Sequence, residues 1–158
     1  PEWLLAAAFV ESTYNPTAGS SKQAVGIWQF IPGTGDRYGL RRTAYVDERT
    51  HPEKSTRAAA RYLRDLYALF GDWKLALAAY NWGETRVARL IRRTGVRDFW
   101  MLAAKGYFPA ETANYVPAIL AAAQLFNLPG ALPPQQVNAA YQLPPPPAGM
   151  KWQLVKQK

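Results

Sequence analysis

The central part of the sequence carries apolar residues at helical spacing, with glycine where the helical pattern stops. Ala59, Leu63, Leu66 and Phe70 recur on one face until Gly71, which is typical of an amphipathic helix closed by glycine. Patterns that predict β-strands are almost absent. The sequence therefore predicts an all-α domain.

The other helices are predicted from the same periodicity and from capping residues. We expect helical segments before Asn15-Pro16, from Thr50-His51-Pro52 onward, and over 73–80, 85–93, 98–104 and 110–126. Because proline deep inside a helix costs ~3 kcal/mol, we expect a break or kink at Pro117, or a helix that begins just before it.

Glu11 lies near the end of the first predicted helix, on the same face as the apolar Ala7. Asn15-Pro16 should stop this helix near Tyr14, which leaves Glu11 in the last turn. Burial and the negative end of the helix dipole both favour the protonated carboxyl group. A carboxyl group that keeps its proton near neutral pH can act as a general acid.

The stretch that follows Glu11 combines amide, hydroxyl, glycine and aromatic residues, as a sugar-binding cleft does. Gly26 suits a close approach of the backbone, and the Gln29 amide can both donate and accept hydrogen bonds. Flat apolar faces for pyranose rings are expected from Trp28, Phe30 and Tyr38.

Composition excludes several kinds of chemistry. The chain has no cysteine and one histidine, His51, which rules against thiolate chemistry, a His-rich metal site and a Ser-His-Asp triad built on Ser12. We expect His51 at the surface or at a helix start. The net charge of +8 favours an anionic partner, but the basic residues are scattered and match no nucleic-acid-binding motif.

The 158 residues, 49% of them hydrophobic, suit one domain with a sizeable core. We place this domain at residues 1–128 and a Pro-rich extension or linker at 129–158, of which 149–158 forms an unassigned tail. The sequence has no apolar run long enough to span a membrane and no export signal. Because it begins at Pro1 without Met, we expect it to be part of a longer precursor.

Ordered motifs resemble the lytic murein transglycosylases with an SLT-type catalytic domain. They are Glu-Ser-x-Tyr-Asn-Pro from Glu11, then Ser20, Gly-Ile-Trp-Gln ending at Gln29, residues 79–84 (AYNWGE) and residues 111–117 (ETANYVP). The resemblance covers most of the chain and is closest to the membrane-bound lytic murein transglycosylase D group. It implies a lysozyme-like helical fold of the goose-type lysozyme and SLT kind.

The resemblance also implies an activity, cleavage of the bond between N-acetylmuramic acid and N-acetylglucosamine without water, which leaves 1,6-anhydro ends. Glu11 would act first as acid and then as base, and the acetamido group of the sugar would stabilise the cation. The stretch around Glu11 offers no second carboxylate for the usual glycosidase pair, since Asp36 and Asp47 are expected in solvated ion pairs.

Substrate-binding roles are implied for residues that match the family motifs, namely Ser20, Gln29, Tyr80, Asn81 and Tyr115. From position alone, Tyr80 and Tyr115 fit core tyrosines equally well. The implied partner is the peptidoglycan glycan strand, with no nucleic acid, metal or cofactor. A monomer in the periplasm or bacterial cell envelope is expected, and a membrane anchor or LysM modules can lie outside this fragment.

Two alternatives remain open at this point. One is a goose-type lysozyme-like muramidase, in which water replaces the muramoyl O6 hydroxyl. The other is a glycan-binding module that keeps the cleft without turnover. The products of murein digestion separate these hypotheses.

Overall fold

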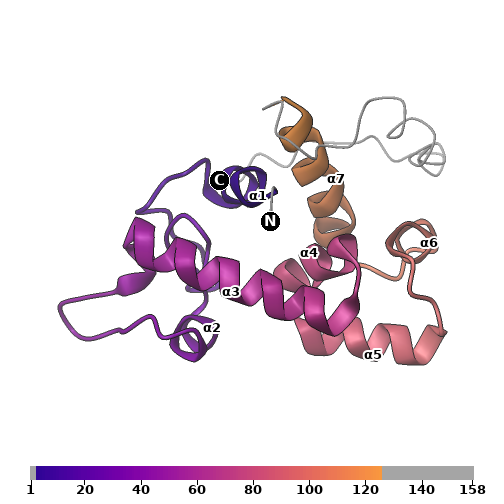
Figure 1. Ribbon diagram of the computed structural model, residues 1–158, viewed down its shortest axis with the longest axis horizontal. Helices are drawn as coiled ribbons and strands as arrows, with labels where there is room; N and C mark the ends of the chain where they lie inside the picture. Colours follow the sequence, from indigo (N-terminus) through magenta and orange to yellow (C-terminus); the bar gives the residue numbers. More distant parts are fainter. Residues whose placement is uncertain (1–2, 126–158) are drawn as a thin grey trace.

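The computed structural model describes residues 3–125, and this part of the chain is all-α, as predicted. In chain order its elements are α1 (Leu4–Ser12), α2 (Pro32–Arg37), the short 3-10 helix η1 (Glu48–Thr50), α3 (Pro52–Phe70), α4 (Trp73–Trp82), α5 (Glu84–Thr94), α6 (Phe99–Ala104) and α7 (Ala110–Leu125) (Figure 1). Extended pairing among the described residues is limited to isolated bridges such as Gly19 with Val25. Residues 126–158, with the predicted Pro-rich extension, lie outside the described residues.

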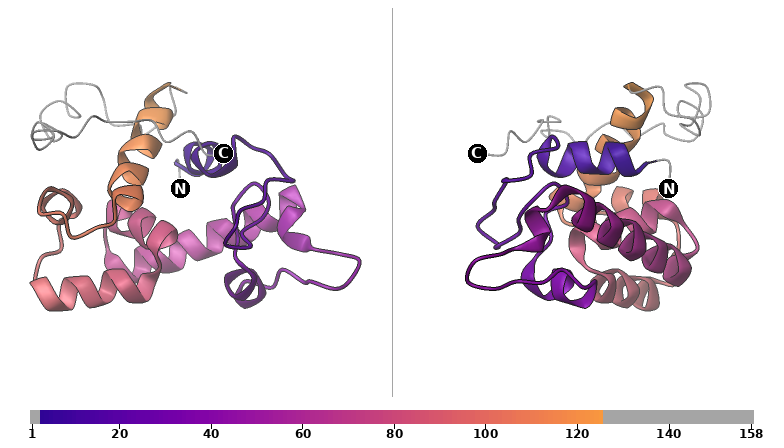
Figure 2. Two further views of the ribbon diagram at one scale, coloured as in Figure 1. Left: turned by 180° about the vertical axis from the view of Figure 1, so that it is seen from behind. Right: turned by 60° about the vertical axis from the view of Figure 1, so that its left-hand side comes forward.

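Helix α4 is the centre of the helical packing. It packs against α3, α5 and α7, and α7 in turn packs against α1, so that α1 and α7 lie together along the upper side of the molecule in Figures 1 and 2. Residues 75–79 of α4 are all buried, and several of them are alanines. Small side chains allow close approach of neighbouring helices, which is how α4 can contact three of them.

The predicted end of α3 and the predicted start of α4 are confirmed, and both have a capping residue. The Asp72 side chain accepts a hydrogen bond from the Leu75 amide at 2.9 Å, and Gly71 closes α3 at φ 68°. His51 lies at the start of α3, as expected, and its Nδ1 accepts from the Lys54 amide at 3.5 Å.

Helix α1 ends at Ser12, slightly earlier than the end near Tyr14 that the sequence predicted. Thr13 and Tyr14 adopt left-handed backbone angles, φ 52° and 62°, so the chain turns before Asn15-Pro16 is reached. The Tyr14 hydroxyl donates to the Leu5 carbonyl at 2.9 Å and fixes the turn against the helix. Glu11 therefore lies in the last turn, as predicted.

Helix α7 rules out two of the alternatives expected at Pro117, a break and a helix start. The helix does not break or begin there; it continues from Ala110 to Leu125 with Pro117 inside it. Proline has no N–H, so the carbonyl of Ala113 lacks its usual helical donor at this position. The neighbours Val116 and Ile119 are fully buried, and this packing offsets the lost hydrogen bond.

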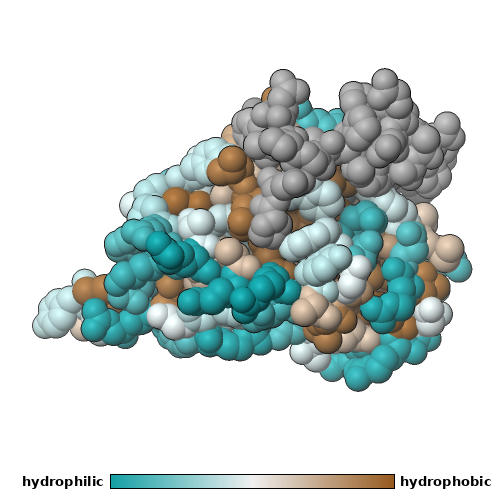
Figure 3. All heavy atoms as spheres, in the orientation of Figure 1, coloured by the Kyte–Doolittle hydropathy of each residue, from teal (hydrophilic) through white to brown (hydrophobic). Residues whose placement is uncertain are grey.

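Helix α3 has the two faces that the sequence predicted. Its apolar stripe is buried, whereas Arg57, Arg61 and Arg64 are exposed, and hydrophilic side chains gather over this helix in Figure 3. None of the helices within residues 3–125 is both long and apolar enough to cross a membrane.

Candidate active site

The end of α1 meets α7 through Glu11 and Tyr115. The Tyr115 hydroxyl donates a hydrogen bond of 2.6 Å to Oε1 of Glu11. Tyr115 is buried, and Glu11 keeps only part of its surface. Helix α1 therefore places one carboxyl group against the first turns of α7, far away along the chain.

The environment of Glu11 favours the protonated carboxyl group. Burial removes water from the carboxyl group and is the main reason that its pKa rises from 4.5 to about 7. The Tyr115 hydrogen bond acts in the opposite direction, because it stabilises the carboxylate. The negative charge of Glu111 adds a further, smaller increase. Near neutral pH, both protonation states of Glu11 are populated.

Tyr80 lies within the same electrostatic environment as Glu11. Burial and the charge of Glu11 hold the pKa of Tyr80 well above its usual value, so the phenol keeps its proton. Its hydroxyl donates to the Trp28 carbonyl at 2.9 Å. The hydroxyl of Ser12, next to Glu11, donates to the Ile27 carbonyl at 2.9 Å. These bonds attach the 18–30 loop to α1 and to α4.

Asn81 links α4 to the start of α7. Its Oδ1 accepts from the hydroxyl of the buried Thr112 at 2.8 Å, and its Nδ2 donates to Oε1 of Glu111 at 3.3 Å. The other Glu111 oxygen lies 3.5 Å from Nζ of Lys22, which belongs to the 18–30 loop. Asn81 and Glu111 thus join α4, the start of α7 and the 18–30 loop.

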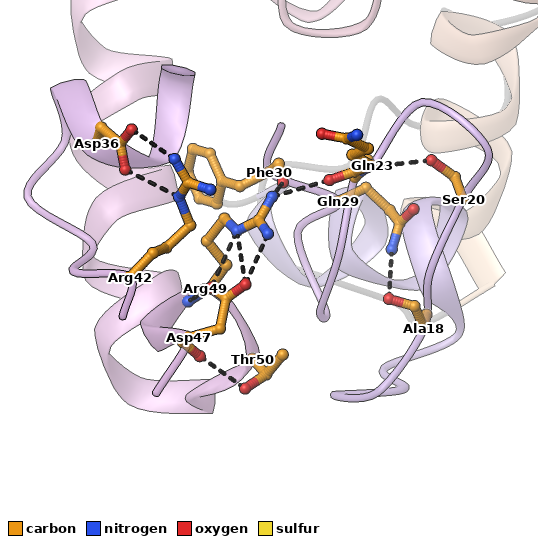
Figure 4. Close-up of polar contacts among 11 residues, drawn as sticks. Ala18, Ser20, Gln23, Gln29, Phe30, Asp36, Arg42, Asp47, Arg49 and Thr50 are labelled. Carbon is orange, nitrogen blue, oxygen red and sulfur yellow. Dashed lines mark hydrogen bonds and ion pairs between the residues drawn. The ribbon is translucent and has the colours of Figure 1, made fainter. Parts of the chain in front are cut away.

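Ser20 and Gln29 both lie on the 18–30 loop. The Gln29 amide nitrogen donates to the carbonyls of Ala18 at 3.3 Å and Gly26 at 2.9 Å (Figure 4). Both amide hydrogens are therefore used, and Oε1 is the atom that Gln29 can offer to a ligand. The Ser20 hydroxyl accepts from the Ala24 amide at 3.2 Å and still has its own hydrogen to donate. Among the described residues, neither side chain hydrogen-bonds to Glu11.

Two of the three aromatic residues that were expected to stack on sugar rings are buried in the core instead. Trp28 and Phe30 are each only 2% exposed and belong to the core, and the Trp28 indole donates to the Thr56 hydroxyl at 2.9 Å. Tyr38 is partly buried, with Arg37 placed 5.1 Å from the centre of its ring. Phe30 packs against Tyr62 of α3 and Tyr80 of α4, so it fills space between these two helices.

Glu111 and Arg49 contribute to the site but were not predicted from the sequence. The sequence did indicate a role for Glu111, since this residue is the first of the Glu-Thr-Ala-Asn-Tyr motif. Because Glu111 and Glu11 are far apart along the chain, the sequence did not indicate that their charges interact. Asp36 forms an exposed ion pair with Arg42, as expected, whereas the partner of Asp47 is the buried Arg49. No sequence pattern indicated that this arginine is inside the protein.

The titratable groups of the site do not resemble a metal centre. Within residues 3–125, His, Asp and Glu side chains do not gather in groups of three or more. What the site contains instead is one carboxyl group that can both lose and gain a proton near neutral pH and that accepts a hydrogen bond from the Tyr115 hydroxyl. Such a group suits proton transfer to and from oxygen atoms of a polar ligand.

Comparisons with known proteins give a consistent result. The transglycosylase SLT domain model matches residues 1–102. The membrane-bound lytic murein transglycosylase D of Escherichia coli is 42% identical over 132 residues, which cover 80% of this chain and 28% of that protein. The chain thus spans about a quarter of the length of this relative.

Solved structures agree with the sequence matches. The 70 kDa soluble lytic transglycosylase of Escherichia coli, in complex with bulgecin A, superposes with a TM-score of 0.68 at 26% identity, over 80% of this chain and 21% of that chain. An inactive glutamate-to-glutamine mutant of lytic transglycosylase Slt from Pseudomonas aeruginosa superposes with a TM-score of 0.66 at 28% identity. The match covers 87% of this chain and 22% of that chain. The predicted family and helical fold are confirmed. The chain belongs to the transglycosylase SLT domain family.

Proposed function

We propose that this chain is the catalytic part of a peptidoglycan lytic transglycosylase. The observation that supports this most is Glu11, a desolvated carboxyl group with a pKa of about 7 in a chain whose relatives are murein transglycosylases. The relative from Pseudomonas aeruginosa that lost activity carries a glutamate-to-glutamine change, in keeping with a catalytic carboxyl group in this family.

The first step uses the protonated form of Glu11. The carboxyl group donates its proton to the oxygen that bridges N-acetylmuramic acid and N-acetylglucosamine, and the bond from this oxygen to the muramoyl anomeric carbon breaks. The carbonyl oxygen of the muramoyl acetamido group attacks the anomeric carbon and takes up the positive charge. The substrate thus supplies the nucleophile that a second carboxylate supplies in most glycosidases.

The second step uses the ionised form. Glu11 removes the proton of the muramoyl O6 hydroxyl, O6 bonds to the anomeric carbon and the acetamido oxygen leaves. The product is a 1,6-anhydro end, no water is consumed, and Glu11 regains the proton that it gave away. A pKa near neutral pH suits both steps, because neither protonation state is strongly disfavoured.

The neighbours of Glu11 have distinct roles in this proposal. Tyr115 orients the carboxyl group and stabilises its ionised form through the 2.6 Å hydrogen bond. Tyr80, a phenol that keeps its proton, and Asn81 form the floor and the α7 side of the site. Ser20 offers a hydroxyl donor and Gln29 an amide acceptor to the sugar from the 18–30 loop.

Product analysis tests this function. Purified murein digested by the 158-residue chain should release fragments with 1,6-anhydro ends, detected by mass spectrometry. The Glu11→Gln variant should release none while it still binds murein. Reducing ends in place of anhydro ends, or normal lysis by the variant, would contradict the proposal. Binding without turnover by the unmodified chain would favour a glycan-binding module.

Hydrolysis is the second candidate, and Glu111 is the observation that favours it. This carboxylate is close enough to Glu11 for its charge to raise the pKa of Glu11, so a base for a water molecule exists at the site. Against it, Glu111 is exposed and bound to Asn81 and Lys22. If the reaction is hydrolysis, the Glu111→Gln variant should lose its turnover. If the reaction is transglycosylation, this variant should retain most of its turnover.

We further propose that residues 1–128 form the catalytic domain, that 129–158 form an extension, and that the protein acts as a monomer in the bacterial cell envelope. Peptidoglycan glycan strands are its partner in this proposal. The net charge of +8 supports an anionic wall polymer. A membrane anchor or LysM modules would belong to the rest of a longer protein.

A further inference from the structure

We propose that Arg49 is a positioning residue, whose buried guanidinium group holds the 18–30 loop in the shape that presents Ser20 and Gln29 to the glycan. This inference rests on the proposed function, because it assigns a role within the same site. Figure 4 shows Arg49 between Asp47 and the loop.

The contacts of Arg49 clamp both ends of the loop segment that carries Gln29. Its Nη1 donates to the carbonyls of Gln23 and Phe30, each at 2.8 Å. On its other side, Nε and Nη2 donate to Asp47 at 2.9 Å and 2.6 Å. The Arg49 side chain is only 6% exposed, so these charge-assisted bonds have little competition from water.

The loop needs such a clamp because its backbone is unusual. Gln23 and Gln29 adopt left-handed angles of φ 60° and 47°, with Gly26 at 81° between them. Non-glycine residues disfavour this region, so tertiary contacts have to maintain it. The carbonyls that Arg49 binds belong to Gln23 itself and to the residue after Gln29.

The clamp is connected to the catalytic group. Between the two bound carbonyls, Ile27 accepts from Ser12 and Trp28 accepts from Tyr80, both at 2.9 Å. A shift of the loop would therefore move the neighbours of Glu11 together with Gln29. Arg49 itself lies on η1, and its side-chain hydrogen bonds go to Asp47 and to two backbone carbonyls of the loop, so it acts through the loop.

Two glycines lie so close to Arg49 that any side chain on them would collide with it. A Cβ atom on Gly35 would lie 2.9 Å from Cδ of Arg49, and one on Gly26 would lie 2.2 Å from its carbonyl oxygen. Lysine in this space keeps the charge but not the planar fork, so it cannot serve Asp47 and both carbonyls together.

The test compares Arg49→Lys with Arg42→Lys in the 158-residue chain. Arg42 binds Asp36 with similar chemistry, at 3.0 Å and 2.8 Å, but at the exposed surface, so it is a matched control. On murein, we expect Arg49→Lys to lower kcat/KM at least tenfold, mainly through KM, and Arg42→Lys to stay within twofold. An unchanged KM for the folded Arg49→Lys protein would overturn the proposal.

A double-mutant cycle shows whether Arg49 acts through the loop. Once Gln29→Ala has removed one of the two presented side chains, adding Arg49→Lys should cause a smaller further loss than Arg49→Lys causes in the unmodified chain. Independent, multiplying losses would count against a positioning role. Should Arg49→Lys fail to fold, Asp47→Asn loosens the same guanidinium group and should raise KM in the same way; a normal KM would overturn the proposal.

Binding separates this inference from the proposed function. In the Glu11→Gln background, the affinity for tetra-N-acetylchitotetraose should fall at least fivefold on Arg49→Lys. Equal affinities would refute the positioning role, even if the chain cleaves murein as proposed. If the unmodified chain does not cleave murein, the proposed function fails, whereas weaker binding by Arg49→Lys still supports the clamp.

Discussion

Replacement of Glu11 by glutamine should make the protein more stable at alkaline pH. The substitution keeps the shape of the side chain and an oxygen that can accept the hydrogen bond of Tyr115. It removes the group that has to ionise inside the site. A functional carboxyl group in a buried site commonly lowers the free energy of unfolding. For Glu11, the size of this effect can be calculated from its pKa.

The magnitude follows from the pKa of Glu11 in the folded chain. A rise from 4.5 to about 7 means that the folded state binds the proton more tightly than the unfolded state. The free energy of unfolding therefore falls as the pH rises through this interval, by up to about 3 kcal/mol at pH values above about 8. The free energy of unfolding of the Glu11→Gln variant does not fall in this way, because glutamine does not ionise. It should match the unmodified chain at about pH 4.5 and exceed it by up to about 3 kcal/mol at about pH 8.

Urea denaturation, followed by tryptophan fluorescence, measures this difference. The curves should be recorded for both proteins at several pH values, and the difference between the two proteins taken at each pH. Other carboxyl groups, such as Asp47 and Glu84, have a lowered pKa because of their arginine partners. Their contribution changes with pH in the opposite sense, but it is common to both proteins and cancels in the difference.

Glu53→Gln is the control for removal of a charge from a helix. Glu53 is exposed and pairs with Arg57 one turn further along α3, so we expect a change below about 1 kcal/mol at every pH. A difference in the free energy of unfolding between Glu11→Gln and the unmodified chain that is the same at acid and alkaline pH would refute this prediction. That result would mean that Glu11 ionises as freely in the folded chain as in the unfolded one.

Three further predictions concern the same site. Tyr115→Phe removes the hydrogen bond that favours ionised Glu11, so the alkaline limb of the pH profile of kcat/KM should move to higher pH. Glu111→Gln removes a like charge and should move this limb to lower pH, with a smaller shift at high salt. Gly26→Ala introduces a Cβ 2.2 Å from the Arg49 carbonyl oxygen at φ 81° and should cost more than about 2 kcal/mol in urea denaturation.

Periodicity and capping were sufficient to predict most of the helical framework. The stripe of α3 and the caps at Asp72 and Gly71 depend on residues close in sequence, and local rules describe them well. The position of Glu11 in the last turn of α1 was predictable for the same reason, since residues of its own segment determine where this helix ends. The continuation of α7 through Pro117 was not predictable, because packing of α7 against α1 and α4 outweighs a local preference.

The 18–30 loop shows where local rules stop. Its composition suggested aromatic faces for sugars, yet the structure uses Trp28 and Phe30 to fill the core. The left-handed angle of Gln29 is not a preference of glutamine; it is maintained by contacts that include the clamp from Arg49, on a different segment. A motif that contains Glu11, Ser20 and Gln29 therefore specifies the chemical groups of the site, but their arrangement also depends on residues outside the motif. By this reasoning, the pair of Asp47 and Arg49 belongs to the functional unit although neither side chain faces the substrate in the proposed mechanism.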